Sequence, residues 1–372
     1  MKLVRRVLKS TGIVMLVVVL MSGLLLFVAY WKSTNDCDRN AATPSSPMKA
    51  ILNCEYGVEN LQLRDIEKPT PVDNEVLVRV RAASVNPVDG HTIRGAWLMR
   101  PMSGMRKPKN TRFGTDFAGV VEAVGKNVTD FKPGDEVFGA KNGAVADYIC
   151  VKAERAIVMK PSNITFEQAG SVAVAALTAL QGLRDKGKIQ SGQKVLINGA
   201  SGGVGTFAVQ IAKAFGTDVT AVCSTRNIEL VKSIGADRVI DYTKEDFTKT
   251  DQRYDMLYDL VGNHSFSERR KILTPNGICV LAGIGGAGVH PEMLDRIGRN
   301  FGNAFLSNFS NQKFVFYIAR LTKDDLNVLR GLMQSGKVAP VIDRTYKISE
   351  TQAAVRYLEE GHARGKVVIV TE

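Results

Sequence analysis

The sequence predicts an α/β protein with two globular parts: a region of short antiparallel strands and a later doubly wound parallel sheet, with a transmembrane helix at the N-terminus. Three observations predict this. An uncharged run occupies residues 10–31, glycine and proline punctuate short β-type segments over residues 48–161, and apolar strands alternate with helices from residue 195 onward. With 372 residues and 45% hydrophobic content, the chain is long enough for two domains with substantial cores.

The N-terminal segment has the features of a membrane anchor. Four basic residues precede the uncharged run from Ser10 to Trp31. As a helix of 22 residues, this run would be about 33 Å long, which matches a bilayer. A cleaved signal peptide is the alternative, but the run is longer than a usual signal and no small-residue cleavage site follows. Residues 1–47 are therefore predicted to be an anchor and a polar linker.

The sequence does not determine on which side of the membrane the globular part lies. The positive-inside rule places the basic end in the cytoplasm and the remainder across the membrane. The five cysteines show no regular spacing, and Cys223 and Cys279 fall in predicted buried strands, a pattern that favours a reducing compartment. These two indications disagree.

The net charge of +12 does not indicate a nucleic-acid partner. Residues 1–47 contribute +4, from six basic and two acidic residues. No basic run is interleaved with aromatic residues, so nucleic-acid binding is not expected.

Residues 48–161 carry the signals of a compact β-domain. Residues 75–82 alternate with period two, as a half-buried antiparallel strand does. Further strands are predicted at residues 48–52 and 117–125, and Pro133-Gly134 forms a turn that leads into a strand ending near residue 139. Such spacing is typical of a barrel-like domain.

A glycine-rich turn between a strand and a helix predicts a dinucleotide site. A β-branched, apolar run that begins at Lys194 is predicted to be a buried parallel strand and leads into this turn, and a helix with an apolar face follows it at residues 207–214. Ala200, Gly202 and Gly205 occupy the three fingerprint positions at which backbone N–H groups and a helix N-terminus face a pyrophosphate.

The residues after the next strand indicate NADPH. The strand at residues 218–223 is followed by Ser224-Thr225-Arg226-Asn227. An NAD site would place an acidic residue there, whereas a hydroxyl and a guanidinium can bind a 2′-phosphate. The alternative is that Arg226 only begins the next helix in solvent.

The rest of the chain completes the two sheets. Parallel strands are predicted at residues 238–240, 256–261 and 278–283. Segments 341–342 and 366–370 are predicted to return to the first domain.

Several ordered motifs resemble those of the medium-chain dehydrogenase/reductase superfamily. They are Ser84–Asp89, Gly114–Val121, Pro133–Val137, Ala200–Gly205, Gly235–Asp237 and Gly365–Val368. The zinc-less quinone oxidoreductase-like branch fits best. The resemblance implies a GroES-like β-barrel catalytic domain over residues 48–173, completed by 340–372, and a Rossmann NADPH-binding domain over 174–339. It also implies a homodimer by analogy.

The positions that hold catalytic zinc in other members carry unsuitable residues here. Matched by motif, they fall on Asn86, on Thr115 and near Val174, and none of these is a good zinc ligand. The structural zinc lobe would need four cysteines, and residues 97–112 contain none. We therefore expect no metal, and reduction of a polarised acceptor such as a quinone or an α,β-unsaturated carbonyl compound.

The resemblance also implies individual site residues. Asn86 is expected to orient the acceptor carbonyl beside the nicotinamide. The expected cofactor contacts are Ser201, Gly202, Gly203 and Val204 at the pyrophosphate, Ser224, Arg226 and Tyr242 at the 2′-phosphate or adenine ribose, and Thr178, Gly262, Gly283 and Ile284 around the nicotinamide and its ribose.

The sequence does not identify the proton donor. Asp89, His91 and Arg94 lie near Asn86, and water or the cofactor ribose are further sources. A second functional hypothesis is a non-catalytic NADPH-binding membrane protein that acts as a sensor or scaffold.

Overall fold

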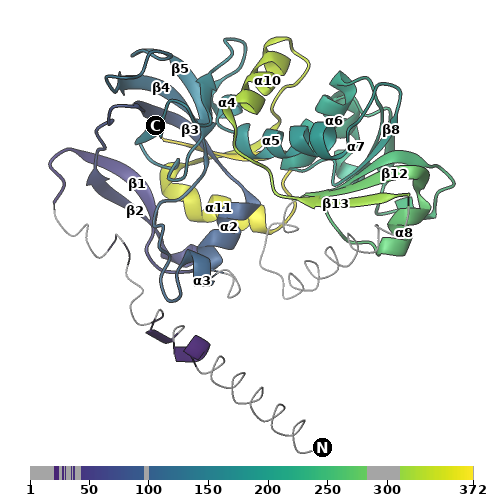
Figure 1. Cartoon of the computed structure of the whole chain (residues 1–372), viewed down its shortest axis with the longest axis horizontal. Coiled ribbons are helices and arrows are strands. Elements are labelled where there is room, and N and C mark those ends of the chain that lie inside the picture. The colour runs from purple at the N-terminus through teal and green to yellow at the C-terminus, as the bar shows by residue number, and fades with distance from the viewer. Residues whose placement is uncertain are drawn as a thin grey trace, which may run out of the picture.

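The computed structural model describes residues 21–24, 27–28, 30, 35, 37, 43–95, 100–282 and 311–371. Figure 1 shows two groups of strands, with helix α5 (Ala173–Gln181) between them. Strands β1 and β2 form a separate hairpin at the edge of the first group.

The first group is a seven-stranded sheet with its two-stranded hairpin. The sheet order is β14-β15-β3-β4-β5-β7, and β6 pairs with β3. The strands are β1 (Pro47–Asn53), β2 (Leu61–Glu67), β3 (Glu75–Val85), β4 (Asp116–Val124), β5 (Glu136–Ala140), β6 (Tyr148–Lys152), β7 (Ile157–Met159), β14 (Ile342–Lys347) and β15 (Lys366–Val370). The predicted return of the last strand to this domain is confirmed, because β15 pairs antiparallel with β3.

Short helices accompany the strands of this domain. They are α2 (Pro87–Arg94), α3 (Arg100–Ser103), α4 (Phe166–Ala169) and α11 (Thr351–Glu359). Figure 1 shows α2 beside α11, and the two helices are joined by an ion pair in which Arg94 Nη2 lies 2.6 Å from Glu359 Oε2.

The second group is a six-stranded parallel sheet of order β10-β9-β8-β11-β12-β13. Its strands are β8 (Lys194–Asn198), β9 (Asp218–Cys223), β10 (Arg238–Asp241), β11 (Tyr254–Asp259), β12 (Leu273–Ala282) and β13 (Lys313–Tyr317). This is the doubly wound order, with its switch point between β8 and β11. Val195 and Ile197 pack in one buried cluster and Leu196 in another, so both faces of the sheet are covered.

The helices of this domain are α5, α6 (Gly203–Ala214), α7 (Ile228–Ser233), α8 (Phe266–Lys271) and α10 (Lys323–Gln334). Figure 1 shows α5 and α6 on one side of the sheet and α8 on the other. A π-helical turn, Gly182–Lys186, continues α5. Four 3₁₀ turns complete the described elements: Val58–Asn60, Thr225–Asn227, Phe247–Lys249 and Ile348–Glu350.

The predicted membrane anchor lies mostly outside the described residues. The described positions within 10–31, namely 21–24, 27–28 and 30, are helical. Among the described residues, no helix combines the length and apolar character needed to cross a bilayer. The anchor therefore stays a prediction.

The structure contains a disulfide that the cysteine spacing did not indicate. Cys37 and Cys54 form a disulfide with a Cα–Cα distance of 5.8 Å. Asn35 supports this junction, because its side-chain amide donates to the Cys54 carbonyl at 2.7 Å. Spacing could not reveal the pair, since it depends on where the linker meets the end of β1. The argument for a reducing compartment thus loses its basis in cysteine usage.

Candidate active site

The glycine turn has the geometry that a dinucleotide requires. Gly199 follows β8 with φ +87°, a conformation that favours glycine. A Cβ on Gly205 would lie 2.2 Å from the Gly199 carbonyl oxygen, so the helix can approach the turn only without a side chain there. Gly202 is the N-cap of α6, and Gly203 and Val204 begin the helix. Their backbone N–H groups lie at the end of the helix that favours anions.

Asn227 joins two of the predicted cofactor residues. Its side-chain amide donates to Ser201 Oγ at 2.9 Å and to Ser224 Oγ at 3.1 Å. Asn227 is 5% exposed, and its Oδ1 has no hydrogen-bond partner in the part of the chain that the structure describes. A buried acceptor without a partner fits a site for ribose hydroxyl groups.

Arg226 and Tyr242 lie at the same edge of the sheet. Tyr242 follows β10, and its backbone N–H donates to the Cys223 carbonyl at the end of β9. Its side chain is 59% exposed. Arg226 Nη2 donates to the His362 carbonyl at 2.7 Å, which connects the predicted phosphate site to the first domain.

Among the described residues, Asp241 is the only carboxylate that is bonded to the segment Ser224–Asn227, which follows β9. Thr225 Oγ1 donates to Asp241 Oδ2 at 2.5 Å, and Thr243 Oγ1 donates to the other oxygen at 2.7 Å. The Thr225 hydroxyl lowers the pKa of Asp241 to about 2. The carboxylate is thus occupied by hydroxyl groups rather than placed to accept from a ribose.

A polar clamp holds the switch point of the sheet. Asn198 ends β8, Asp259 ends β11, and the Asn198 amide donates to Asp259 Oδ1 at 2.9 Å. The same oxygen accepts from the backbone N–H of Gly262 at 2.9 Å. Arg269 Nε lies 2.8 Å from Asp259 Oδ2, and both side chains are buried. This clamp fixes Gly262, which has φ +73°. Gly283 and Ile284 lie outside the described residues.

Two tyrosine hydroxyls bond the backbone carbonyl of Thr178. The hydroxyls of Tyr258 and Tyr317 both donate to the Thr178 carbonyl, the first at 2.9 Å. A Cβ on Gly182 would lie 2.5 Å from either hydroxyl. The two tyrosines therefore occupy the place where α5 changes to its π-helical turn, a type of irregularity often found at functional sites.

Asn86 belongs to a buried polar network that three chain segments form. Its amide donates to Asp116 Oδ2 at 3.0 Å, and its Oδ1 accepts from Lys366 Nζ at 2.5 Å. Ser84 Oγ also donates to Asp116 Oδ2, at 2.8 Å. Lys366 Nζ lies 3.4 Å from Asp116 Oδ2. The strand register explains the cluster, because Ser84 is opposite Asp116 and Val85 is opposite Val367.

Asp89 extends this network toward Thr115. The Asn86 backbone N–H donates to Asp89 Oδ2 at 2.7 Å, and Thr115 Oγ1 donates to Asp89 Oδ1 at 3.2 Å. Asp89 is 6% exposed. Burial raises the pKa of Asp89 to about 7, with a further contribution from the charge of Asp116.

The network meets the glycine turn at the boundary between the domains. Asp116 Oδ1 accepts from the backbone N–H of Val174 in α5 at 2.8 Å. Gly202 and Gly365 form a β-bridge, and a Cβ on Gly203 would lie 3.2 Å from Lys366 Cδ. Asn86 is thus brought close to the predicted pyrophosphate site, at the carboxyl ends of the parallel strands, where open α/β sheets bind their ligands.

These residues do not fit a catalytic zinc ion. Both amide atoms of Asn86 are bonded within the network, and the Lys366 ammonium takes its Oδ1. Within the described ranges, no group of three or more His, Cys, Asp or Glu side chains could hold a metal. We derive no step through a metal, and metal independence stays a prediction.

Sequence reasoning missed three members of the network and one residue at the predicted cofactor site. Lys366, Asp116, Ser84 and Asn227 all lie in segments that were recognised, but no role was assigned to them. A charged residue at the start of an apolar strand could have indicated the network. Asp116 and Lys366 each begin a buried strand, and buried charges are rare unless they are paired.

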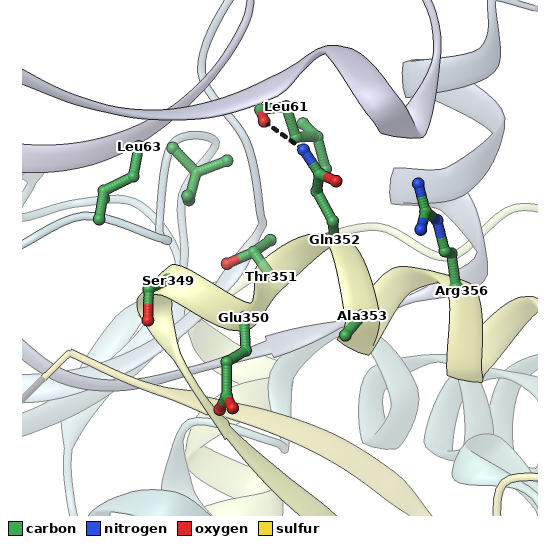
Figure 2. A pocket seen from close by; sticks show the side chains of 9 residues that line it. Leu61, Leu63, Ser349, Glu350, Thr351, Gln352, Ala353 and Arg356 are labelled. Atoms are coloured by element: carbon green, nitrogen blue, oxygen red, sulfur yellow. Dashed lines mark hydrogen bonds between the residues drawn. The ribbon is translucent and has the colours of Figure 1, made fainter.

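A separate groove of about 430 Å³ lies between β2 and the start of α11. Figure 2 shows Leu61 and Leu63 on one side and Glu350, Gln352 and Arg356 on the other. Gln352 donates to the Leu61 carbonyl at 2.8 Å across it. None of the predicted site residues lines this groove.

A β-domain joined to a doubly wound sheet with a glycine turn is typical of nicotinamide-dependent oxidoreductases. Two family models match the chain: an alcohol dehydrogenase GroES-like domain over residues 72–162, and a zinc-binding dehydrogenase over residues 234–369. The chain belongs to the medium-chain dehydrogenase/reductase superfamily.

Several characterised proteins are similar over most of their length. The NAD(P)H oxidoreductase RTN4IP1 of Homo sapiens mitochondria is 34% identical over 367 residues, which cover 87% of this chain and 89% of that protein. The 2-methylene-furan-3-one reductase of Solanum lycopersicum is 34% identical, with 87% and 79% covered. The solved quinone oxidoreductase from Coxiella burnetii is 29% identical with a TM-score of 0.75, and covers 88% of this chain and 100% of that one.

Proposed function

We propose that this chain is an NADPH-dependent reductase that transfers a hydride, without a metal, to a quinone or an α,β-unsaturated carbonyl compound. The observation that carries the proposal is the buried network around Asn86. By motif match, Asn86 and Thr115 stand where zinc members of the superfamily carry metal ligands; here the Asn86 amide is bonded to Asp116 and Lys366, and the Thr115 hydroxyl to Asp89. Such groups can orient a polarised carbonyl but do not replace the Lewis acid that alcohol oxidation uses.

The names of similar proteins support this class of acceptor. One is an NADPH-dependent alkenal/one oxidoreductase of Arabidopsis thaliana chloroplasts, which is 34% identical with 87% of this chain covered. Another is a chloroplast envelope quinone oxidoreductase homolog of the same plant, which is 32% identical with 84% covered. Both names describe an electrophilic acceptor, which agrees with the chemistry of the network.

In this proposal the cofactor supplies the hydride, and the protein supplies position and charge. The backbone N–H groups of Gly203 and Val204 bind the pyrophosphate, while Ser224 and Arg226 bind the 2′-phosphate. Asn86 gives one N–H to Asp116, and the second, which bonds no other described residue, is available for the acceptor carbonyl. Lys366 fixes the amide orientation, because its ammonium can pair only with the oxygen of Asn86.

We also propose that residues 10–31 attach the protein to a membrane, where lipophilic quinones or enals are concentrated. The described side chains there support this, since Met21, Leu24 and Phe27 are 54%, 56% and 60% exposed. Carbonate extraction of membranes that contain the full chain tests the anchor. Retention in the pellet is expected, and release into the supernatant would contradict it.

The function is tested by adding quinones, enals and enones to the full chain and following NADPH absorbance. Oxidation of NADPH with members of this set, and little with NADH, is expected. Absence of NADPH binding in a fluorescence titration would end the proposal. Binding without turnover across the whole set would instead favour a sensor or scaffold.

A further inference from the structure

We propose that Thr115 and Asp89 deliver the proton to the reduced acceptor, with the Thr115 hydroxyl as the direct donor and Asp89 as the buried acid that resupplies it. This inference rests on the proposed reductase function and adds the proton source that the sequence left open.

The geometry assigns the two carboxyl oxygens of Asp89 to different partners. Oδ2 accepts the Asn86 backbone N–H at 2.7 Å, which closes the first turn of α2. Oδ1 lies 3.2 Å from Thr115 Oγ1. Asp89 is 6% exposed, whereas Thr115 is only half-buried. A hydroxyl can accept one proton while it donates another, so Thr115 can connect the buried acid with a bound acceptor.

Thr115 is joined to the Asn86 network through Asp89. The Asp89 carboxyl group bonds the Thr115 hydroxyl through one oxygen and the Asn86 backbone N–H through the other. In this proposal, a carbonyl compound oriented by the Asn86 amide lies beside the Thr115 side chain. Proton donors need this hydrogen-bonding reach before their acidity matters.

The surroundings favour a protonated Asp89 near neutral pH. Burial is the main cause of its raised pKa of about 7, Asp116 raises it further, and Lys366 opposes both. The remaining titratable groups on the packed elements are not among the main causes of this raised pKa. They are His91 and Arg94 on α2, Glu359 on α11, which is paired with Arg94, and Glu59 beside that pair.

The proposed step balances for an α,β-unsaturated carbonyl. The hydride electron pair forms a C–H bond at the β-carbon, and the electrons of the C=C bond move to give an enolate. The enolate takes the Thr115 hydroxyl proton at its α-carbon, while Asp89 passes its own proton to the Thr115 oxygen. Asp89 then takes a proton from water, so each turnover consumes one hydride and one proton.

Isosteric variants of the full chain test the pair. Thr115→Val removes the hydroxyl, and Asp89→Asn keeps an oxygen for the Asn86 N–H but removes the acid. Each is expected to lower kcat about 100-fold with the KM for NADPH unchanged. Thr115→Ser restores the hydroxyl and is expected to recover most of the rate. In the wild type kcat falls above about pH 7, following the pKa of Asp89, and Asp89→Asn removes this inflection.

A second readout needs neither cofactor nor acceptor. A carboxyl whose pKa is raised in the folded state holds its proton longer there than in the unfolded chain, so the free energy of unfolding decreases as pH rises from about 4 to about 7. Urea titrations of the wild type should show this decrease, and Asp89→Asn should show a flatter profile.

The outcomes separate the two proposals. Full turnover with unchanged rates and pH profiles in Thr115→Val and Asp89→Asn would overturn the pair alone and assign the proton to water. A chain that binds NADPH but reduces no acceptor would overturn the pair together with the proposed function. Equal stability profiles of the wild type and Asp89→Asn would overturn Asp89 as the acid.

Discussion

The two sides of the proposed cofactor site, the glycine turn and the Asn86 network, are constructed differently. On the side of the parallel sheet, Gly199 to Gly205 form a turn whose working groups are backbone N–H groups at a helix N-terminus. On the side of the first domain, the working groups are the buried side chains of Asn86, Asp116 and Lys366. The first side needs the absence of side chains, and the second needs charged side chains that are fully paired.

This difference predicts which kind of substitution disrupts each side. Backbone sites depend on local conformation, so a single added methyl group can close them. Buried charge networks depend on every member, because removal of one partner leaves another charge desolvated and unpaired. The following variants test the contrast, beginning with the largest expected effect.

Lys366→Met should destabilise the protein most. It leaves Asp116 buried without its ammonium partner, and breaking such a pair costs about 3–5 kcal/mol in the free energy of unfolding. Urea denaturation measures the change. Lys337→Met, at an exposed position, serves as the matched control and should change little. If Lys366→Met were as stable as the wild type, the network would not be held by charge.

Gly205→Ala should act on the other side of the cleft. Its Cβ would lie 2.2 Å from the Gly199 oxygen, so the turn must shift, at a cost of about 1–3 kcal/mol and with loss of NADPH affinity. Gly331→Ala is the control, because nothing lies within 4 Å of its Cβ on helix α10. Fluorescence titration with NADPH compares them, and equal affinity in both variants would contradict the proposed pyrophosphate site.

Arg226→Ala should have the smallest effect and change cofactor preference rather than stability. One hydrogen bond to a charged phosphate contributes about 1.5 kcal/mol, so the preference for NADPH over NADH should fall roughly tenfold. The His362 carbonyl, which now accepts from Arg226, can bond water instead. Arg356→Ala, in the separate groove, is the control. An unchanged ratio of dissociation constants would leave Arg226 without a role in phosphate binding.

The sequence predicted what is local and missed what is assembled over long distances. The parallel strands and the glycine turn were predicted because apolar runs and glycine spacing are continuous in the chain; β9 and β15 begin and end where they were expected. The partners of Asn86 could not be predicted, since Asp116 and Lys366 are 30 and 280 residues away from it and only the strand register joins them. The disulfide was missed because it depends on where the linker meets the end of β1.

The predicted site residues show the same difference between local and long-range features. Ser201, Gly202, Ser224 and Arg226 lie together at the carboxyl edge of the parallel sheet, as consecutive strand ends of one sheet must. Asn227, which joins two of them, was passed over because asparagine after a strand is ordinary in a loop. The domain boundaries, the individual roles and the homodimer remain predictions.

The central claim is that a nicotinamide dinucleotide lies between the glycine turn and the Asn86 network. A crystal structure of the full chain grown with NADP⁺ tests it directly. We expect pyrophosphate density at the N–H groups of Gly203 and Val204, and the nicotinamide ring beside Asn86 and Thr115. Dinucleotide density elsewhere, or a metal ion bound at Asn86, would contradict the account.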